Sequence, residues 1–352
     1  MNGRKVVSVV LIGFIMTGMM FASGQKDQAA VDDGIVRVAM VFNQLGDMGF
    51  NDEGFSGLEM ARDELGVEIS YVEAPEIAEV ESQLGMYAED GIYDLILVLG
   101  ATYADSITSV AKMYPEQSFS IVDTAMEGHG LPNLHGVAAW DPEQTFLSGC
   151  IAGFVTMSDE MPLSDGNNVV GFVGGMDSPA SRAGAAGFLA GAKYANPDVE
   201  LIYTIAGSYR DPSKGKEIAL AAYDKGADVV SHNAGGTGLG VFDAAAEVNK
   251  YVIGSSLSSL DVDRSLCTSM KRTDLFVFQE IEAMVNGTWK AGSDRKGLAE
   301  GVCYYDVENL NTVLPEKIVS AVEEIKNRVI SGEIRLVNDP GEIEAWSKVN
   351  SY

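Results

Sequence analysis

The sequence contains few of the residues that most often carry covalent or metal chemistry. Only 3 of its 352 residues are cysteines and only 3 are histidines. Cys150, Cys267 and Cys303 lie far apart and form no Cys-x-x-Cys pair, so neither a disulfide framework nor a cysteine metal site is predicted. His129 and His135 flank a Gly/Pro loop, and a metal shared between them is the less favoured interpretation.

Basic residues are also scarce. The chain has 24 Lys and Arg against 51 Asp and Glu, which gives a formal net charge of −27. No basic stripe offsets this charge, and a strongly acidic surface repels phosphate backbones, so nucleic-acid binding is excluded. We expect a ligand that is small and either neutral or cationic.

Enzyme signatures are missing from the sequence. It has no Gly-x4-Gly-Lys-Ser/Thr phosphate loop, no Gly-x-Ser-x-Gly elbow and no His-Glu-x-x-His pair. Two carboxylates such as Asp47 and Asp123 could perform acid–base chemistry, but hydrogen bonding to a small ligand is the commoner use of such residues. We therefore predict that the protein is not an enzyme and needs no cofactor.

The one long apolar run, Val6 to Ala22, stands at the N-terminus. Arg4 and Lys5 precede it and Ala22-Ser-Gly24 follows it, a pattern typical of a signal peptide over residues 1–24 with cleavage before Gln25. An uncleaved anchor is the alternative. We expect export, with residues 25–34 as a linker. No cysteine stands near the cleavage site, so a lipid anchor is not predicted.

Strand and helix patterns alternate through two successive halves of the chain, which predicts an α/β fold with parallel sheets buried on both faces. We place lobe 1 at residues 35–138 plus about 258–292, and lobe 2 at residues 139–257 plus about 293–352. The expected strands are Val36–Phe42, Val67–Val72, Leu95–Leu99, Phe119–Val122, Val169–Val173, Glu200–Ile205, Ala227–Val230 and Tyr251–Ile253. The pattern pauses at His135–Pro142.

Glycine-rich or polar segments follow almost every expected strand. Ligands of open parallel sheets bind beyond the carboxyl ends of the strands, so these segments are the candidate site. Any single one is better interpreted as an ordinary turn, whereas their repetition favours a site. They include Asn43–Asn51, Gly100, Asp123, Gly174–Asp177, Gly207–Asp211, Asn233–Gly236 and Ser255–Ser256. Phe50 and Tyr209 supply aromatic faces within them, although both could instead pack at lobe surfaces.

Several longer motifs resemble one family. They include Gly46-Asp-x-x-Phe-Asn-Asp52, Gly171-Phe-Val-Gly-Gly-Met176, Gly207-Ser-Tyr-x-Asp-Pro-x-Lys-Gly215, Ala234-Gly-Gly-Thr-Gly-Leu-Gly-Val-Phe242 and Tyr251-Val-Ile-Gly254. In this order, and over nearly the whole chain, the sequence is similar to the basic membrane lipoprotein family, also called the purine nucleoside receptor A-like binding proteins of ABC transporters. The resemblance implies a type I periplasmic binding protein, with two Rossmann-like α/β lobes joined by three crossovers, the first near Ala138–Asp141.

The resemblance also implies a ligand and the residues that bind it. An aromatic residue from each lobe would sandwich a purine base, and carboxylates and amides would hold the base edge and the ribose. The matching positions are Asp47, Phe50, Asn51, Asp123, Tyr209, Gly236, Ser256 and Lys271. Tyr209 replaces the usual phenylalanine, and Ser256 stands where the family has an aspartate that grips the ribose.

These observations predict an exported, monomeric binding protein that delivers a nucleoside-like molecule to an ABC permease. A sensor or receptor ectodomain for a sugar or another small solute is the main alternative, and an exported nucleoside-acting enzyme is a weaker one. A DNA-binding repressor of similar fold is disfavoured because an export signal stands where the DNA-binding helices would be.

Overall fold

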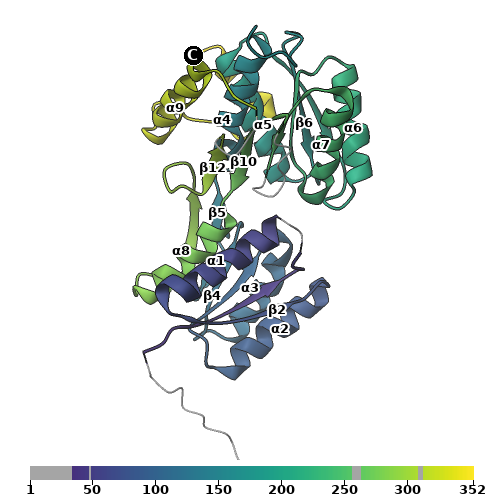
Figure 1. Ribbon diagram of the computed structural model, residues 1–352. Coiled ribbons are helices and arrows are strands. Elements are labelled where there is room, and N and C mark those ends of the chain that lie inside the picture. The colour runs from purple at the N-terminus through teal and green to yellow at the C-terminus, as the bar shows by residue number, and fades with distance from the viewer. Residues whose placement is uncertain (1–33, 47–48, 256–262, 308–311) are drawn as a thin grey trace, which may run out of the picture. The chain divides into compact units, whose positions relative to one another are not determined.

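The computed structural model describes residues 34–46, 49–255, 263–307 and 312–352, and Figure 1 shows its elements. The predicted signal peptide therefore lies outside the described residues. None of the helices in these ranges combines the length and the apolar composition that crossing a membrane requires.

Two six-stranded sheets form within the described residues, and the first is parallel throughout, in the order β2-β1-β3-β4-β5-β11. Its strands are β1 (Arg37–Phe42), β2 (Glu68–Glu73), β3 (Leu95–Leu99), β4 (Ser118–Val122), β5 (Leu134–Ala139) and β11 (Gly292–Lys296). Its helices are α1 (Phe50–Leu65), α2 (Ile77–Asp90), α3 (Ala104–Met113), with a short 3₁₀ turn η1 (Ala101–Tyr103) before it, and α8 (Thr273–Val285). We call this sheet and these helices the first lobe.

Successive side chains of β1 point to opposite faces of the first sheet, and both faces are covered by helices. Val38 and Met40 pack in one apolar cluster with residues of α1 and α8. Ala39 and Val41 pack in another with residues of α2 and α3. This burial on both faces explains why the strand reads as a continuous apolar run.

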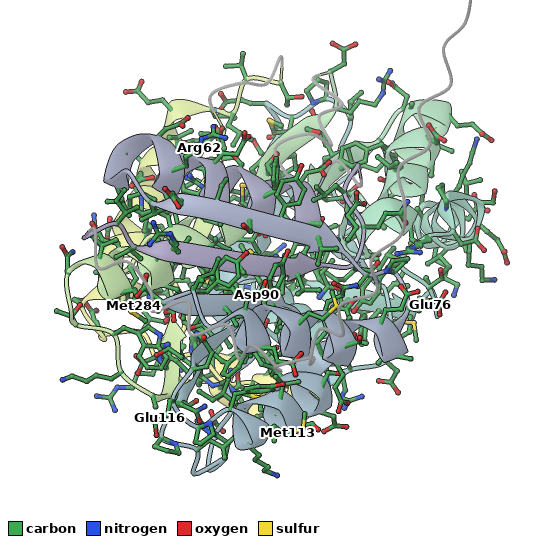
Figure 2. The ribbon with its side chains drawn as sticks, turned by 90° about the horizontal axis from the view of Figure 1, so that it is seen from below. Arg62, Glu76, Asp90, Met113, Glu116 and Met284 are labelled. Atoms are coloured by element: carbon green, nitrogen blue, oxygen red, sulfur yellow. The ribbon has the colours of Figure 1, made fainter. Side chains whose placement is uncertain are left out.

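The carboxyl edge of the first sheet can be located in Figure 2. Arg62, in the last turn of α1, and Glu76, directly before α2, lie on opposite sides of that view. Parallel strand–helix alternation requires this arrangement, because each helix returns the chain to the edge where the next strand begins. The carboxyl ends of the strands lie on the Glu76 side.

The second sheet has the order β12-β10-β9-β8-β6-β7, with β12 antiparallel to β10 and its other pairs parallel. Its strands are β6 (Val169–Gly174), β7 (Glu200–Ile205), β8 (Val229–Asn233), β9 (Tyr251–Gly254), β10 (Ser265–Lys271) and β12 (Cys303–Asp306). We call it, with its helices, the second lobe. They are α4 (Asp141–Thr156), α5 (Pro179–Ala195), α6 (Pro212–Asp224), α7 (Leu239–Val248), α9 (Glu316–Ile330), α10 (Ile343–Ser347) and the 3₁₀ turns η2 (Gly235–Gly238) and η3 (Pro340–Glu342).

Along the described residues the chain passes between the two sheets three times. The first passage is Trp140, within the segment where the sequence predicted a hinge, the second is Arg272, and the third is residues 297–302. Trp140 N donates to Lys296 O at 2.7 Å, and Arg272 N donates to Val302 O at 2.8 Å. These hydrogen bonds hold the three crossovers side by side. The fold is the two-lobed type I periplasmic binding protein architecture that the resemblance implied.

Two strands differ from the allocation expected from the sequence. We expected residues 258–292 in the first lobe, but β10 pairs with β9 in the second sheet. We expected residues after about 293 in the second lobe, but β11 pairs with β5 in the first sheet. The sequence of β11, Gly-Ser-Asp-Arg-Lys, is polar because the strand forms the edge of its sheet, so it carries no apolar signal.

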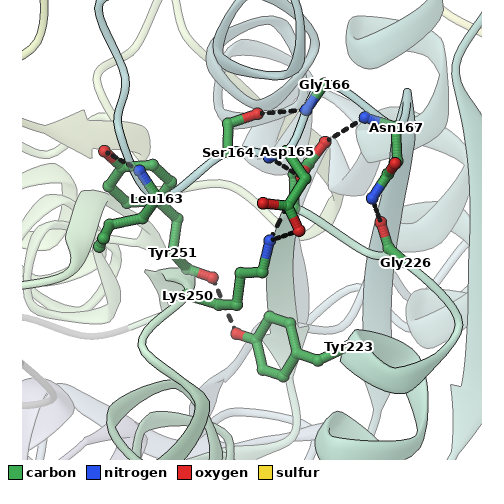
Figure 3. A network of polar contacts seen from close by, with 10 residues as sticks. Leu163, Ser164, Asp165, Gly166, Asn167, Tyr223, Gly226, Lys250 and Tyr251 are labelled. Atoms are coloured by element: carbon green, nitrogen blue, oxygen red, sulfur yellow. Dashed lines mark hydrogen bonds and ion pairs between the residues drawn. The ribbon is translucent and has the colours of Figure 1, made fainter.

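Asp228 directly precedes β8 and so lies at the amino edge of the second sheet. Figure 3 shows the neighbouring residues Asp165, Asn167 and Lys250. The buried Asp228 carboxylate accepts hydrogen bonds from Asp165 N at 2.7 Å and Asn167 N at 3.0 Å. Lys250 Nζ lies 3.6 Å from Asp228 and 2.6 Å from the Asp165 carboxylate. Because a buried carboxylate needs such partners, Gly226-Ala-Asp228 is a structural motif rather than part of the ligand edge.

Candidate ligand-binding site

The predicted site residues that the structure describes lie in segments directly after the strands or at their carboxyl ends. In the first lobe, Asn43 follows β1, Gly100 follows β3 and Asp123 follows β4. In the second lobe, Tyr209 lies in the loop after β7, and Lys271 is the last residue of β10. Asp47 and Ser256 lie outside the described residues.

Asp123 and Lys271, separated by 148 positions in the sequence, form an ion pair. Lys271 Nζ lies 2.9 and 3.3 Å from the two Asp123 carboxylate oxygens, and 2.6 Å from Asp141 Oδ1. Asp141 begins α4 directly after the first crossover, and Lys271 directly precedes the second. The cluster therefore joins the first sheet's carboxyl edge to two crossovers. Sequence reasoning named Asp123 and Lys271 separately and missed Asp141.

The electrostatics of this cluster favour a charged lysine. Burial alone would lower the pKa of Lys271, but the carboxylates of Asp123 and Asp141 outweigh burial and hold that pKa above its ordinary value. Burial raises the pKa of Asp123, although Lys271 opposes the shift. Asp123 has a φ of 59°, in the left-handed region that aspartate tolerates better than most residues. Its two oxygens can accept further hydrogen bonds beyond those from Lys271.

Phe50 is half-buried at the start of α1 and packs against an apolar cluster that contains residues of both lobes. A Cβ at Gly100 would lie 3.6 Å from Phe50 Cε1, so the ring lies beside the end of β3. Thr273 Oγ1 donates to Phe50 O at 3.3 Å, which ties the start of α1 to the start of α8. The adjacent residue, Asn51, is also half-buried.

Tyr209 lies on the second lobe with its side chain 45% exposed. A Cβ at Gly175 would overlap the Tyr209 ring, so the ring rests against the backbone that follows β6. A Cβ at Gly236 would lie 3.3 Å from Tyr209 O, so this glycine also allows the loop after β7 to approach η2. The predicted residues Tyr209 and Gly236 are thus neighbours in space.

His232 lies beneath this glycine-rich turn. A Cβ at Gly238 would overlap its imidazole ring, and Phe242 contacts the ring edge-on with 5.8 Å between centroids. Ser255 Oγ lies 3.3 Å from His232 Nδ1. Burial lowers the pKa of His232 to about 4, so the imidazole is neutral at pH 7. The residue supports the turn and was not singled out from the sequence.

A polar contact joins the two lobes at the loop that carries Tyr209. Arg210 Nη2, in the loop of Tyr209, donates to Asn43 Oδ1 at 2.6 Å. Asn43 Nδ2 in turn lies 2.6 Å from Tyr103 OH and 3.3 Å from Pro75 O. Since the Pro75 carbonyl can only accept, the orientation of the Asn43 amide is set. The sequence offered no signal for this contact beyond the position of Asn43 after a strand.

Comparisons with known proteins agree with this architecture. A sequence model of the family described as ABC transporter substrate-binding protein, PnrA-like, matches residues 35–339. The chain belongs to this family. As a member it is the substrate-binding component of an ABC transporter, and its partners are a small-molecule ligand and a membrane permease. Family membership supports the prediction that it is not an enzyme.

Individual relatives and solved structures have similar lengths. The chain is 30% identical to an uncharacterized lipoprotein of Pyrococcus furiosus, over 94% of this chain and 86% of that protein. It is 26% identical to basic membrane protein A2 of Borrelia garinii, over 87% of this chain and 90% of that protein. The crystal structure of an ABC transporter solute-binding protein from Aeropyrum pernix K1 superposes with a TM-score of 0.75 and 27% identity, covering 90% of this chain and 99% of that one.

Proposed function

We propose that this substrate-binding protein takes a purine nucleoside, or a closely related molecule, between its lobes and presents it to the permease. The supporting observation is the hydrogen bond from Arg210 to Asn43, which joins the loop of Tyr209 to the segment that leads from β1 to Phe50. Tyr209 lies in this loop and Phe50 begins the helix that follows this segment, so the two aromatic residues belong to different lobes. A planar base enclosed between two aromatic faces is the ligand that suits such a pair.

The polar residues of the site suit the remainder of a nucleoside. In this proposal Asp47, Asn51 and Asp123 accept from or donate to the base edge and the ribose hydroxyls, Gly236 contributes backbone, and Lys271 neutralises Asp123. Ser256 offers a single hydroxyl where the family has a carboxylate that accepts from two ribose hydroxyls. The base therefore carries more of the affinity, and discrimination between ribose and deoxyribose is weak.

Export and a membrane partner complete the proposal. Residues 1–24 have the pattern of a signal peptide, and two of the relatives are named as a lipoprotein and a basic membrane protein. We propose that the mature chain begins near Gln25 and acts as a monomer at the outer face of the membrane, where the permease receives its ligand.

A thermal screen tests the proposed ligand. The protein is unfolded and refolded to remove bound molecules, and guanosine, inosine, adenosine and free ribose are then added separately. A ligand at 100 times its dissociation constant raises the free energy of unfolding by about 2.7 kcal/mol, which a melting experiment detects. We expect at least one purine nucleoside to raise the melting temperature and free ribose to have no effect.

Variants of the aromatic residues localise the binding. Since stacking on one aromatic residue contributes about 1–3 kcal/mol, Phe50→Ala and Tyr209→Ala each weaken nucleoside affinity by about 5- to 150-fold in calorimetry. Tyr71→Ala is the matched control, because Tyr71 lies in β2 of the first lobe and is 47% exposed, close to the 45% of Tyr209. If free ribose or an amino acid stabilises the protein and every nucleoside fails, the ligand proposal is wrong.

A further inference from the structure

Thr237 is a buried residue of η2 whose hydroxyl and backbone amide both form hydrogen bonds with the loop that carries Tyr209. Its side chain is fully enclosed, at 0% exposed. Its hydroxyl donates to Ser208 O at 2.9 Å and accepts from Asp211 N at 2.9 Å. Its backbone N donates to Tyr209 O at 3.1 Å. One residue therefore holds the loop on both sides of Tyr209 and at Tyr209 itself.

The loop is also confined from its other sides. The Tyr209 ring rests against Gly175, where a Cβ would overlap it. Asp211 caps α6 by accepting from Lys214 N at 3.0 Å, so the loop ends at a fixed helix start. A Cβ at Gly215 in α6 would overlap Thr237 O, which shows how closely α6 packs against η2. Within this frame the Thr237 hydroxyl is the group that satisfies the Ser208 carbonyl and the Asp211 amide.

Only a hydroxyl can make both bonds, because it donates and accepts through one oxygen. Valine has nearly the same shape but would leave the part-buried Ser208 carbonyl and Asp211 amide without this partner. The loop would then move to hydrate these groups, and the Tyr209 ring would leave its place against Gly175. Serine keeps the oxygen and loses only a methyl group.

We propose that Thr237 is a positioning residue for ligand binding: it fixes the Tyr209 loop so that the aromatic face is already in place before the ligand arrives. Thr237 is enclosed and does not touch the ligand, so it acts only through Tyr209. This inference rests on the proposed function in one respect, namely that the ligand contains an aromatic ring that stacks on Tyr209. Fixing a binding loop in advance increases affinity because less ordering is needed on binding.

Calorimetry with guanosine, inosine and adenosine tests the inference. The four variants are Thr237→Val, Thr237→Ser, Tyr209→Ala and the double variant that combines Tyr209→Ala with Thr237→Val. Because two hydrogen bonds to the loop are lost, we expect Thr237→Val to weaken affinity by about tenfold, and Thr237→Ser to stay within about twofold of the wild type. In a Tyr209→Ala background, adding Thr237→Val changes the affinity by less than about twofold, since residues that act through one another are not additive. If Thr237→Val does not fold, Thr237→Ala takes its place.

Thr156→Val is the matched control. Thr156 is a buried threonine of α4 in the same lobe, and its hydroxyl also donates once, to Gly153 O at 2.9 Å, and accepts once, from Asn196 Nδ2 at 3.0 Å. We expect this variant to be less stable than the wild type but to bind with unchanged affinity. Equal losses of affinity in Thr156→Val and Thr237→Val would mean that general destabilisation is responsible, and the inference would fail.

Hydrogen exchange without ligand separates this inference from the proposed function. The backbone amides of residues 207–211, and that of Asp211 above all, should exchange faster in Thr237→Val and at the wild-type rate in Thr237→Ser. If the wild type binds none of the three nucleosides, the proposed function fails, while the exchange rates still decide whether Thr237 holds the loop. The inference is overturned if the loop amides of Thr237→Val exchange at the wild-type rate. It is also overturned if Thr237→Val weakens ligand affinity as much in the Tyr209→Ala background as in the wild type.

Discussion

Glu280 is a buried carboxyl group of α8 whose partners come from neighbouring strands of the first sheet. Its Oε2 lies 2.7 Å from His135 Nδ1 and accepts from Ser120 Oγ at 2.8 Å. Trp289 Nε1 donates to Ser120 Oγ at 3.0 Å, and Asp294 lies 3.4 Å from His135 Nε2. His135, which the sequence suggested only as a weak metal ligand, therefore lies between two carboxylates, those of Glu280 and Asp294.

This arrangement predicts a pH-dependent contribution of His135 to stability. Burial alone would lower its pKa, but Glu280 and Asp294 outweigh burial and raise the pKa. The folded protein then binds more protons than the unfolded chain above about pH 6.5, the ordinary histidine value. The contribution is complete below that pH and is lost as the pH rises through the raised pKa. Urea unfolding between pH 5 and 8.5 should show that the free energy of unfolding of the wild type declines as the pH rises above 6.5, and that His135→Gln lacks this decline. If the free energies of wild type and variant run parallel above pH 6.5, the prediction is contradicted.

His232 provides an internal comparison, because its pKa is shifted the other way, to about 4, by burial. Between about pH 4 and 6.5 the unfolded chain binds more protons at this residue, so its contribution to stability rises with pH in that window. His232→Gln should therefore reduce the rise of the free energy of unfolding between about pH 4 and 6.5 and leave its pH dependence above 6.5 unchanged. The two histidines thus act in different pH ranges.

At the scale of elements, glycines decide how closely helices pack in the second lobe. A Cβ at Gly149 of α4 would overlap the Phe188 carbonyl of α5, and a Cβ at Gly191 of α5 would overlap the Phe146 carbonyl of α4. The two backbones are thus in direct contact. α4, which contains the small-residue run Ser148–Gly153, is buried along nearly its whole length.

We predict that Gly191→Ala is strongly destabilising. The added methyl group would overlap the Phe146 carbonyl and lie 2.8 Å from Cys150 N, so the helices must separate, at a cost of about 1–3 kcal/mol. Gly85→Ala is the matched control, since Gly85 lies inside α2 with nothing within 4 Å of an added Cβ. There the intrinsic helix preference of alanine should stabilise the protein by about 0.5–1 kcal/mol. In urea unfolding we expect the free energy of unfolding to fall in Gly191→Ala and to rise in Gly85→Ala. A stabilising Gly191→Ala would refute the packing argument.

The sequence predicted some strands better than others, and the difference depends on whether the side chains of a strand form an apolar pattern. β3 and β7 have the bounds that we expected, because both carry an apolar signal, although β3 is buried throughout and β7 is a half-buried edge strand. β5 contains His135 and Gly136 and was taken for a pause. Gly136 is needed there because Met126 would lie 2.6 Å from a Cβ at that position. The polar β11 and the Ser- and Thr-rich β10 were missed, since backbone pairing alone, rather than an apolar pattern, defines them.

At the scale of the whole molecule, the sequence predicted the order of the site segments but not their contacts. Loops at strand ends can be placed from the strand pattern, because parallel topology brings these ends to one edge. The pairing of Lys271 with Asp123 joins residues 148 positions apart, and the contact of Arg210 with Asn43 joins residues 167 apart. Such contacts depend on how the chain passes three times between the sheets, which local patterns do not encode.

The Arg210–Asn43 contact predicts how the lobes respond to ligand. Lobes joined by crossovers close by hinge motion, and the crossovers at Trp140, Arg272 and residues 297–302 are the segments that would bend. Opening at these segments would separate Arg210 from Asn43, because the two residues belong to different lobes. Their hydrogen bond therefore favours the closed form, and a protein that closes more readily binds its ligand more tightly.

We accordingly predict that Arg210→Ala shifts the protein toward an open form. A net hydrogen bond contributes about 0.5–1.5 kcal/mol, so its loss should weaken ligand affinity by about 2- to 10-fold. X-ray scattering should show a larger radius of gyration for ligand-free Arg210→Ala than for the wild type, and the same compact form for both at saturating ligand. Arg182→Ala is the control, because Arg182 is an exposed arginine of the second lobe whose ion pair, with Asp177, stays within that lobe. If Arg210→Ala matches the wild type in both scattering and affinity, the contact does not influence closure, and the ligand must close the lobes through its own contacts.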